Sequence, residues 1–229
     1  MKIIDAHTHV DYITPDVQSG VVGCVCCSTI EDDWKKLIDL IEEDNRVYGA
    51  FGIHPWFVNL VQDDFDVRLK NLLETNLNYM VGEIGLDKYK PNMEKQMDVF
   101  IKQFDLAIRL NRPIFLHCVG AWDKILYVLK QYKKLPIIVM HAFNGNENVL
   151  NNLLKYKNIY FSFNKNALYD RNNRIEQIPT NRILIESDGK KDVNLMKIID
   201  EISSIKNESK IGDIIYNNML RVLENGQVE

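Results

Sequence analysis

The chain has 229 residues and is 46% hydrophobic, 26% charged and 10% aromatic, and its 28 basic and 32 acidic residues give a formal charge of −4. A chain of this length buries roughly 70% of the surface that its unfolded form exposes, so its core needs no disulfides. The negative charge argues against a generic polybasic nucleic-acid binder. No apolar run approaches the ~20 residues of a membrane-spanning helix, so we expect no membrane association.

The four cysteines indicate a reducing compartment. Cys24, Cys26 and Cys27 share one apolar run, and Cys118 stands apart from them. A secreted scaffold would distribute its cysteines over loops, so these side chains are interpreted as buried, reduced thiols. Successive strand residues point to opposite faces, so Cys26 and Cys27 cannot both face one metal ion. Because the chain enters Lys2–Asp5 without a charged-then-apolar signal, we expect a cytoplasmic protein.

Short apolar, β-branched runs recur along the chain, and helical patterns separate most of them. The expected strands are Ile3–Ala6, Val21–Cys26, Val47–Gly52, Tyr79–Glu83, Pro113–His117, Ile137–His141, Ile159–Phe163 and Arg182–Glu186. The expected helices include Asp32–Glu43, Asp64–Asn76, Asn92–Leu110, Ala121–Tyr132 and Glu147–Lys155. In the third of these, Met97, Phe100 and Phe104 have the spacing of a helix with one buried face.

This alternation of strands and helices predicts parallel βαβ units. Eight such units in about 200 residues predict a TIM-type (β/α)8 barrel of the α/β class rather than an open sheet. No linker, compositional break or low-complexity tract divides the chain, so we expect a single domain over residues 1–229. Two polar segments, Asp11–Gly20 and Asn164–Asn173, are irregular, and both follow a strand.

The polar residues fall at one end of the predicted strands. All five histidines lie there: His7 and His9 after the first strand, His54 after the third, His117 after the fifth and His141 after the sixth. Two carboxylates share this location, because Glu83 closes the fourth strand and Asp188 follows the eighth. In a parallel barrel these carboxyl ends converge on one rim, where active sites are built. Chance placement of single histidines does not explain the whole pattern.

The residue types at this rim are those of a metal site. In His7-Thr8-His9, the i, i+2 spacing on an extended segment sends both imidazoles to the same side. Zinc and similar ions accept imidazole and carboxylate ligands together. Four histidines and two carboxylates exceed the needs of one catalytic zinc, so they predict two ions that share a bridging carboxylate, roughly 3.5–4 Å apart.

The residues around these positions resemble a known family. They are Asp5-Ala6-His7-Thr8-His9-Val10-Asp11, Gly52-Ile53-His54-Pro55, Gly82-Glu83-Ile84-Gly85-Leu86-Asp87, Leu116-His117-Cys118, His141-Ala142-Phe143 and Ile185-Glu186-Ser187-Asp188. In this order they resemble the TatD-type metal-dependent hydrolases, and the resemblance resumes at Asn218–Leu223. The segment from Gly82 to Asp87 is its most specific part.

The resemblance implies a TIM-type barrel with a two-metal site that hydrolyses phosphodiesters, commonly as a deoxyribonuclease. It implies that His7, His9 and Asp188 hold one divalent ion, that His117 and His141 hold the other, and that Glu83 bridges them. It further implies that Asp188 and Glu83 are the catalytic carboxylates and that His54 contacts the substrate phosphate. The ions could be zinc, manganese, nickel or magnesium, since such sites accept any of these according to supply.

Some segments depart from the family pattern. Val119-Gly120 stand where many relatives carry Arg-Asp, and Ala142 stands at a position that is commonly cysteine. After Asp188, Gly189–Asp192 leads almost directly to a helix instead of a long basic loop. The residues expected to bind the metal ions are therefore retained, whereas residues expected to contact the substrate differ from the family pattern. The sequence predicts weak, salt-sensitive binding of short single strands or small diesters rather than of long duplex.

Several rim residues are candidates for substrate contact. Trp56 and Tyr89 could stack on a base, and Lys190 is one of several basic residues in rim loops. We expect His54, Trp56 and Lys190 to line the substrate site, with DNA or a small phosphodiester as the partner. The same aromatic residues could instead pack the loops, and basic residues also occur before strands, at Arg112 and Arg182 for example. No sequence feature indicates an obligate protein partner.

Two alternative functions remain open. The first is hydrolysis of C–N or ester bonds, as in the broader amidohydrolase superfamily that uses the same rim. Strand four ends in Glu83, however, where many of those enzymes place a lysine. The second is a degenerate metal-binding protein with little turnover, which the short segment after Asp188 would allow.

Overall fold

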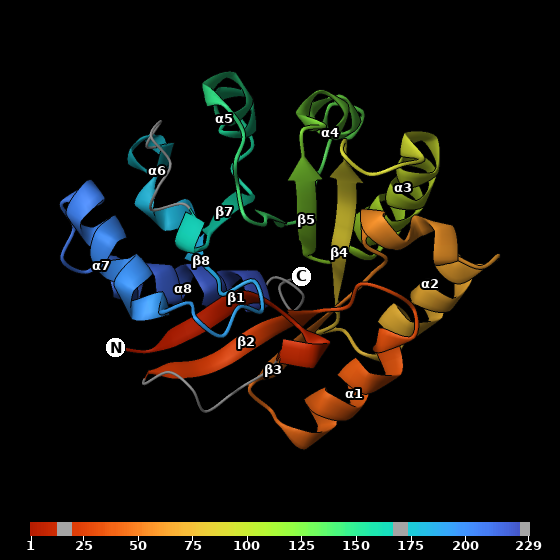
Figure 1. Cartoon of the computed structure of the whole chain (residues 1–229), viewed down its shortest axis with the longest axis horizontal. Helices are drawn as coiled ribbons and strands as arrows, with labels where there is room; N and C mark the ends of the chain where they lie inside the picture. The colour runs from red at the N-terminus through yellow and green to blue at the C-terminus, as the bar shows by residue number, and fades with distance from the viewer. Residues whose placement is uncertain (13–19, 167–173, 225–229) are drawn as a thin grey trace.

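The computed structural model describes residues 1–12, 20–166 and 174–224, and in these ranges it shows one eight-stranded parallel sheet in chain order (Figure 1). The strands are β1 Ile3–His9, β2 Val21–Cys27, β3 Val47–Phe51, β4 Met80–Asp87, β5 Ile114–Val119, β6 Ile138–Met140, β7 Ile159–Phe163 and β8 Ile183–Ile185. The prediction of a TIM-type (β/α)8 barrel is confirmed.

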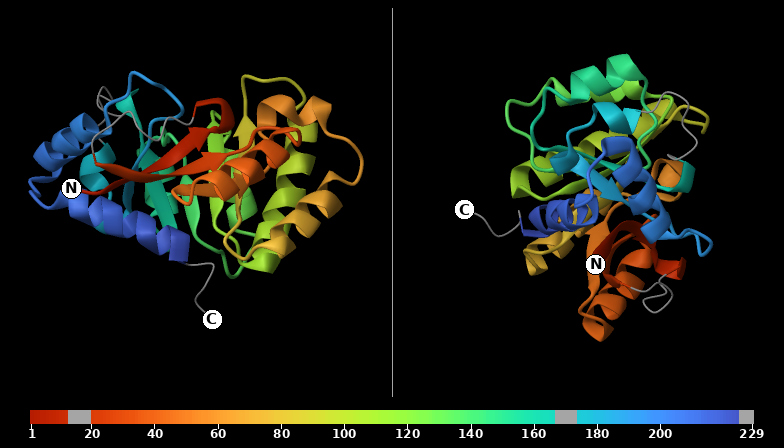
Figure 2. Two further views of the ribbon diagram at one scale, coloured as in Figure 1. Left: turned by 90° about the horizontal axis from the view of Figure 1, so that it is seen from below. Right: turned by 90° about the vertical axis from the view of Figure 1, so that its left-hand side faces the viewer.

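Helices follow the strands and surround the sheet (Figure 2). They are α1 Asp33–Glu43, α2 Phe65–Thr75, α3 Met93–Leu110, α4 Trp122–Leu129, α5 Glu147–Leu153, α6 Arg174–Gln177, α7 Leu195–Lys206 and α8 Ile211–Glu224, with short 3₁₀ turns at η1 Val10–Tyr12, η2 Pro55–Leu60 and η4 Thr180–Arg182. Within the described ranges, none of the helices is long and apolar enough to cross a bilayer. Much of the two segments predicted to be irregular lies outside the described residues.

The buried side chains form two layers, one outside the strands and one inside the barrel. Cys26 belongs to the outer layer between strands and helices, whereas Cys27 belongs to the inner layer, as the alternation of strand residues predicts. The inner layer includes Met219 and Val222 of α8, so this helix packs against the inner layer of the barrel. Asn218 fixes α8 there by donating from Nδ2 to the Ile183 carbonyl at 2.9 Å.

Hydrogen bonds between β1 and the segment that follows β8 connect the first and last parts of the barrel. The Asp188 backbone N–H donates to the His7 carbonyl at 3.0 Å, and the Ser187 N–H donates to Asp5 Oδ1 at 2.9 Å. The same Asp5 oxygen accepts the His7 N–H at 3.2 Å. Buried Asp5 therefore joins β1 to the segment after β8 and places Asp188 beside the histidines of β1.

Four strands continue beyond their predicted ends, β2 by a single residue. β1 includes His7 and His9, β4 runs past Glu83 to Asp87, and β5 runs past His117 to Val119, so the expectation that these residues follow or close their strands is wrong. The reason for β4 is that its pairing with β5 resumes after an irregularity between Val81 and Ile84. Glu83 consequently projects from a continuous strand, which is a more rigid support than a loop.

Gly85 allows β4 and β5 to approach closely at the site. A Cβ atom there would lie 1.9 Å from the His117 carbonyl oxygen, and the φ angle of Gly85 is +149°. Only glycine combines that backbone conformation with so close a contact. The position of His117 thus depends on the absence of a side chain at residue 85.

Candidate metal centre

The carboxylate of Glu83 lies at the centre of the five histidines. Its oxygens are 3.2 Å from His7 Nε2, 3.6 Å from His9 Nε2, 3.3 Å from His54 Nε2, 2.8 Å from His117 Nδ1 and 3.7 Å from His141 Nε2. Glu83 is 1% exposed. The rim predicted from the strand order therefore exists, and every histidine of the chain reaches the same buried anion.

The two histidines of β1 face the same side, as their spacing predicts. His7 Nε2 and His9 Nε2 are 3.3 Å apart. His9 Nδ1 lies 3.2 Å from the Cys27 carbonyl oxygen, which can only accept, so the ring donates from Nδ1 and keeps a lone pair on Nε2. His7 Nδ1 contacts the Cys27 thiol at 3.4 Å. Neighbouring strand β2 thus turns both Nε2 atoms towards Glu83.

His141 is oriented by a second buried carboxylate. Glu186 Oε1 lies 2.9 Å from His141 Nδ1 and accepts the backbone N–H of Ala142 at 3.0 Å. A neutral His141 with its proton on Nδ1 would have its lone pair on Nε2, which is 3.7 Å from Asp188 Oδ1. A carboxylate behind a histidine in this way is the usual outer partner of a metal-ligating imidazole.

His54 has the opposite arrangement. Its Nδ1 accepts the backbone N–H of Trp56 at 3.2 Å, so the proton of the neutral ring resides on Nε2, which faces Glu83. A metal ion needs a lone pair at that nitrogen, and this tautomer offers a hydrogen instead. The geometry therefore favours hydrogen-bond donation to a substrate over metal ligation by His54.

Three groups of donor atoms lie close enough together to hold an ion, although the third includes His54, whose Nε2 carries the proton of the neutral ring. They are His7, His9 and Asp188; His7, Glu83 and His141; and His54, Glu83 and His117, and within each group the ligand atoms lie within 4.8 Å of one another. The first group is the one that the resemblance implies. The expected pairing of His117 with His141 is less direct in the structure, because their ring centroids are 6.1 Å apart and His117 lies nearer to His54, at 4.4 Å.

The buried ionisable groups of the centre shift one another's pKa values. Burial, reinforced by the neighbouring His141, lowers the pKa of His7 to about 4. Burial opposes the protonation of His141 as well, but Glu186 and Glu83 outweigh it and raise the pKa of His141 to about 10. Burial alone would raise the pKa of Glu83, yet the surrounding histidines hold it well below its usual range. Positive charge is therefore favoured at the centre.

Asp188 and Lys190 form an ion pair at the edge of the centre. Lys190 Nζ lies 2.6 Å from Asp188 Oδ2, while Asp188 Oδ1 faces His9 and His141. Burial opposes ionisation, but the neighbouring His9, His141 and Lys190 lower the pKa of Asp188 below its usual range. Lys190 thus lines the cleft as expected, and in this structure its charge is directed at Asp188.

A cleft of about 690 Å³ opens over the donor atoms. Its walls carry the expected His54, Trp56 and Lys190, together with Arg174 from α6 and Asn164 after β7. Arg174 is 9% exposed, so it is a buried cation at a wall of the site. Val119 also lines the cleft and supplies no hydrogen-bond donor from its side chain.

Three buried polar side chains hold the rim in place and would not be selected as site residues from the sequence. Gln103 Oε1 accepts the Ile53 N–H at 2.7 Å, and Gln96 Oε1 accepts the Asp87 N–H at 2.8 Å. Ser28 Oγ accepts the Gly52 N–H at 2.9 Å. The signal for the two glutamines is their spacing of seven, which puts two amides on the apolar face of α3.

Comparison with known families agrees with this geometry. The family model described as TatD related DNase matches residues 4–224. The chain belongs to the TatD-related DNase family. The motifs quoted above for that resemblance all lie within the matched residues.

Relatives with curated names include nucleases and hydrolases. The chain is 31% identical over 159 residues to the human 3'-5' RNA nuclease TATDN2. This match covers 66% of this chain and 21% of TATDN2. It is 29% identical to the metal-dependent hydrolase YabD of Bacillus subtilis, over 67% of this chain and 62% of YabD. These matches thus span less than two thirds of the relatives' own lengths. A match to the 3'-5' ssDNA/RNA exonuclease TatD of Enterobacter lignolyticus is 24% identical and covers 80% of this chain and 73% of that protein.

Solved structures share the fold. The TatD homologue YjjV of Escherichia coli superposes with a TM-score of 0.86 at 22% identity, over 96% of this chain and 97% of YjjV. A TatD family hydrolase of Entamoeba histolytica gives a TM-score of 0.82 at 22% identity, over 97% and 98% of the two chains. These structures support the barrel architecture.

Proposed function

We propose that this protein is a divalent-metal-dependent hydrolase of phosphodiester bonds that acts on the ends of single-stranded nucleic acid. The observation that carries the proposal is the single buried carboxylate of Glu83, which is shared by five histidines and lies beside Asp188 at the floor of an open cleft. The names of the relatives, which include nucleases of RNA and of single-stranded DNA, support the choice of substrate.

The donor set fits divalent ions in chemistry and in protonation. In their neutral forms, His9 and His141 would present Nε2 lone pairs to a ligand, because their Nδ1 atoms lie beside the Cys27 carbonyl and the Glu186 carboxylate. Imidazole and carboxylate donors suit zinc, manganese and nickel, and magnesium where oxygen donors dominate. We infer two ions, with Glu83 as their common ligand, because the donors exceed the three that one catalytic zinc keeps.

The ions, when bound, would polarise a phosphate and lower the pKa of water from ~16 toward ~7. Asp188 is placed to take up the proton of the attacking water, since its Oδ1 faces the centre. Lys190 holds the other oxygen of Asp188 and so fixes the orientation of this base. His54, with its proton on Nε2, would donate a hydrogen bond to a phosphate oxygen.

The wall of the cleft favours a short or single-stranded substrate. A guanidinium binds phosphate through two parallel donors, and Val119 supplies none where many relatives carry arginine. Lys190 remains in the cleft lining as a point charge with less geometric demand, and Arg174, which is only 9% exposed, also lines the cleft. Binding should therefore weaken steeply with salt, as phosphate-mediated binding does.

A substrate panel tests the proposed function. A short single strand, a matched duplex, a small chromogenic diester, a phosphomonoester and an amide are each incubated with zinc, manganese, nickel or magnesium. Cleavage of the single strand and the small diester, with the duplex resistant, is the expected result. Cleavage of the small diester alone would reject the nuclease function, and cleavage of the amide alone would reject phosphodiester chemistry.

A further inference from the structure

Trp56 presents a large aromatic surface inside the cleft, next to the donor atoms. Trp56 directly follows Pro55 in η2. It lines the cleft and is 50% exposed. The Trp56 ring lies edge-on to His54, with 5.2 Å between ring centroids. His54 in turn reaches Glu83 at 3.3 Å. A ligand on Trp56 is therefore separated from the metal centre by one imidazole.

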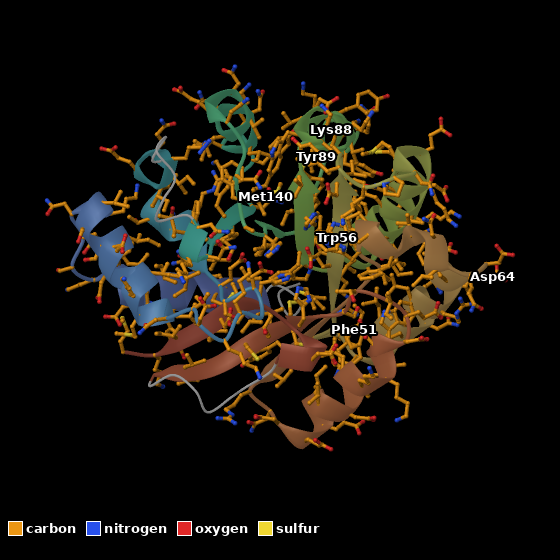
Figure 3. The ribbon with its side chains drawn as sticks, viewed as in Figure 1. Phe51, Trp56, Asp64, Lys88, Tyr89 and Met140 are labelled. Carbon is orange, nitrogen blue, oxygen red and sulfur yellow. The ribbon has the colours of Figure 1, made fainter. Side chains whose placement is uncertain are left out.

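The indole is held in a fixed orientation. Its Nε1 donates to Asp87 Oδ2 at 2.7 Å, and Asp87 is only 3% exposed. The other oxygen of Asp87 accepts the Tyr89 N–H at 2.8 Å, and Gln96 accepts the Asp87 N–H at 2.8 Å. Figure 3 shows Trp56 below Lys88 and Tyr89, which lie together above the end of β4. An exposed ring that is immobilised by a buried carboxylate loses little entropy when a second ring stacks on it.

The ammonium group of a lysine lies over the Trp56 ring. Lys90 Nζ lies 3.9 Å from the Trp56 ring centroid. A cation–π contact at an exposed site is weaker than the stacking of a base on an aromatic side chain, so the ammonium can be redirected when a ligand arrives. A planar π system beside a mobile positive charge matches a nucleobase with its adjoining phosphate.

We propose that Trp56 and Lys90 form a nucleotide subsite, in which the base next to the scissile phosphate stacks on Trp56 and Lys90 pairs with the neighbouring phosphate. This proposal rests on the proposed phosphodiesterase function and specifies how that site recognises its substrate. Asp87 acts through Trp56 as a positioning residue. Because every base has a π face, the subsite selects for an unpaired base without selecting its identity.

An abasic scan tests the stacking step. Short single strands carry one abasic residue at the first, second or third position from the cleaved end, and kcat/KM is compared with that of the intact strand. We expect one position to lose about tenfold in the native protein, and Trp56→Ala to abolish that difference between intact and abasic strands. Trp56→Phe should restore part of it. Tyr127→Ala, which alters a 64% exposed ring outside the cleft lining, is the control and should retain the native ratio.

Binding without turnover separates this proposal from the proposed function. In chelator and with Trp122→Phe as the background, tryptophan fluorescence should be quenched by the intact strand and about tenfold less readily by the abasic one. The background removes the partly buried Trp122 beside Phe143 of the cleft lining, and of the other two tryptophans Trp34 is buried and Trp56 is half exposed. Lys90→Gln should lower the slope of log K against log salt by about 0.7, the single-strand value for one phosphate contact. Lys102→Gln, whose ammonium pairs with Asp98 on α3, should not change that slope.

The possible results decide between the two proposals. If no diester is cleaved but the intact strand binds better than the abasic strand, the phosphodiesterase function fails and the subsite stands. If diesters are cleaved with the same kcat/KM whether or not a base is present, the subsite is overturned and the function stands. A Trp56→Ala protein that fails to fold leaves the native abasic scan and the Lys90→Gln salt slope as the deciding measurements.

Discussion

The two ends of the barrel differ in what their buried charged side chains contact. At the amino-terminal end, Arg182 donates to the carbonyls of Ile159, Leu154 and Leu153, the last two at the end of α5. Arg112 donates likewise to the carbonyls of Leu77 and Leu73, where α2 ends. Free carbonyls at helix ends attract cations, so these guanidinium groups complete the backbone hydrogen bonding.

At the carboxyl-terminal end, ionisable side chains gather around one another in addition to contacting the backbone. His7 stacks on His141 with 3.7 Å between ring centroids, and both rings surround Glu83. Histidines so close together repel one another when protonated and lower each other's pKa. The difference between the ends shows where the fold is stabilised by its own groups and where it is arranged to receive a cation.

The largest effect should follow the replacement of Glu83. Glu83→Gln keeps the shape but removes the anion shared by all five histidines, so metal affinity should fall more than 100-fold, beyond the 10–100-fold loss typical of outer partners. In the native protein, chelation should lower Tm by about 10 °C, because an ion at 1,000 times its Kd contributes about 4 kcal/mol. Differential scanning calorimetry should show this drop vanishing in Glu83→Gln. Glu74→Gln, at an exposed ion pair on α2, should preserve it.

A selective loss of rate is expected at Asp188. Asp188→Asn retains an oxygen for coordination but cannot take up a proton, so turnover should fall by about 10²–10⁴ while metal content changes little. Elemental analysis and steady-state kinetics measure the two quantities. Asp192→Asn, at an exposed carboxylate paired with Lys165, is the matched control. Near-native activity of metal-loaded Asp188→Asn would contradict its assignment as the base.

The opposite end of the barrel should respond in stability alone. Arg182→Leu leaves three carbonyls without their charged donor and should lower the free energy of unfolding by about 2–3 kcal/mol. Denaturant unfolding measures this change, and metal stoichiometry should stay as in the native protein. A fall in metal content with unchanged stability would contradict the division of roles between the two ends.

A smaller effect is expected from the replacement of Glu186, the carboxylate beside His141 Nδ1. Glu186→Gln removes the carboxylate that holds the Nδ1 proton, and metal affinity should fall about 10–100-fold. Competition with a chromogenic chelator measures it. Unchanged affinity would show that His141 is oriented by its packing and not by Glu186.

The pH dependence of metal affinity should reflect the protonation state of His141. In the metal-free protein its pKa of about 10 keeps the ring protonated at neutral pH, whereas His7, at about 4, is already neutral. An entering ion must therefore expel the His141 proton, so affinity should rise about tenfold per pH unit between pH 7 and 9 for each proton released. Calorimetric titration in buffers of different ionisation enthalpy counts these protons. A count of zero at pH 7 would contradict this protonation state.

The sequence was sufficient to predict the barrel and the rim. Continuous apolar strands and helical spacing are local signals, and the order of the strands places the histidines, Glu83 and Asp188 at one end without any knowledge of their contacts. The i, i+2 spacing of His7 and His9 also predicted their common orientation, which their 3.3 Å separation confirms. The assignment of each ion to particular ligands stays a prediction.

Other features depend on contacts between distant parts of the chain. The extension of β4 to Asp87 arises from pairing with β5, and the closure through Asp5 joins residues 182 positions apart. The different tautomers of His54 and His141 depend on whether an N–H or a carboxylate lies behind the ring. Such partners have no fixed sequence spacing, so residue patterns alone could not reveal them.

The most direct test of the account is a crystal structure of the protein loaded with manganese, measured at a wavelength where the metal scatters anomalously. The account predicts two anomalous peaks roughly 3.5–4 Å apart, with Glu83 bound to both and Asp188 to one of them. A single peak at saturating manganese, or two peaks that do not contact Glu83, would contradict it.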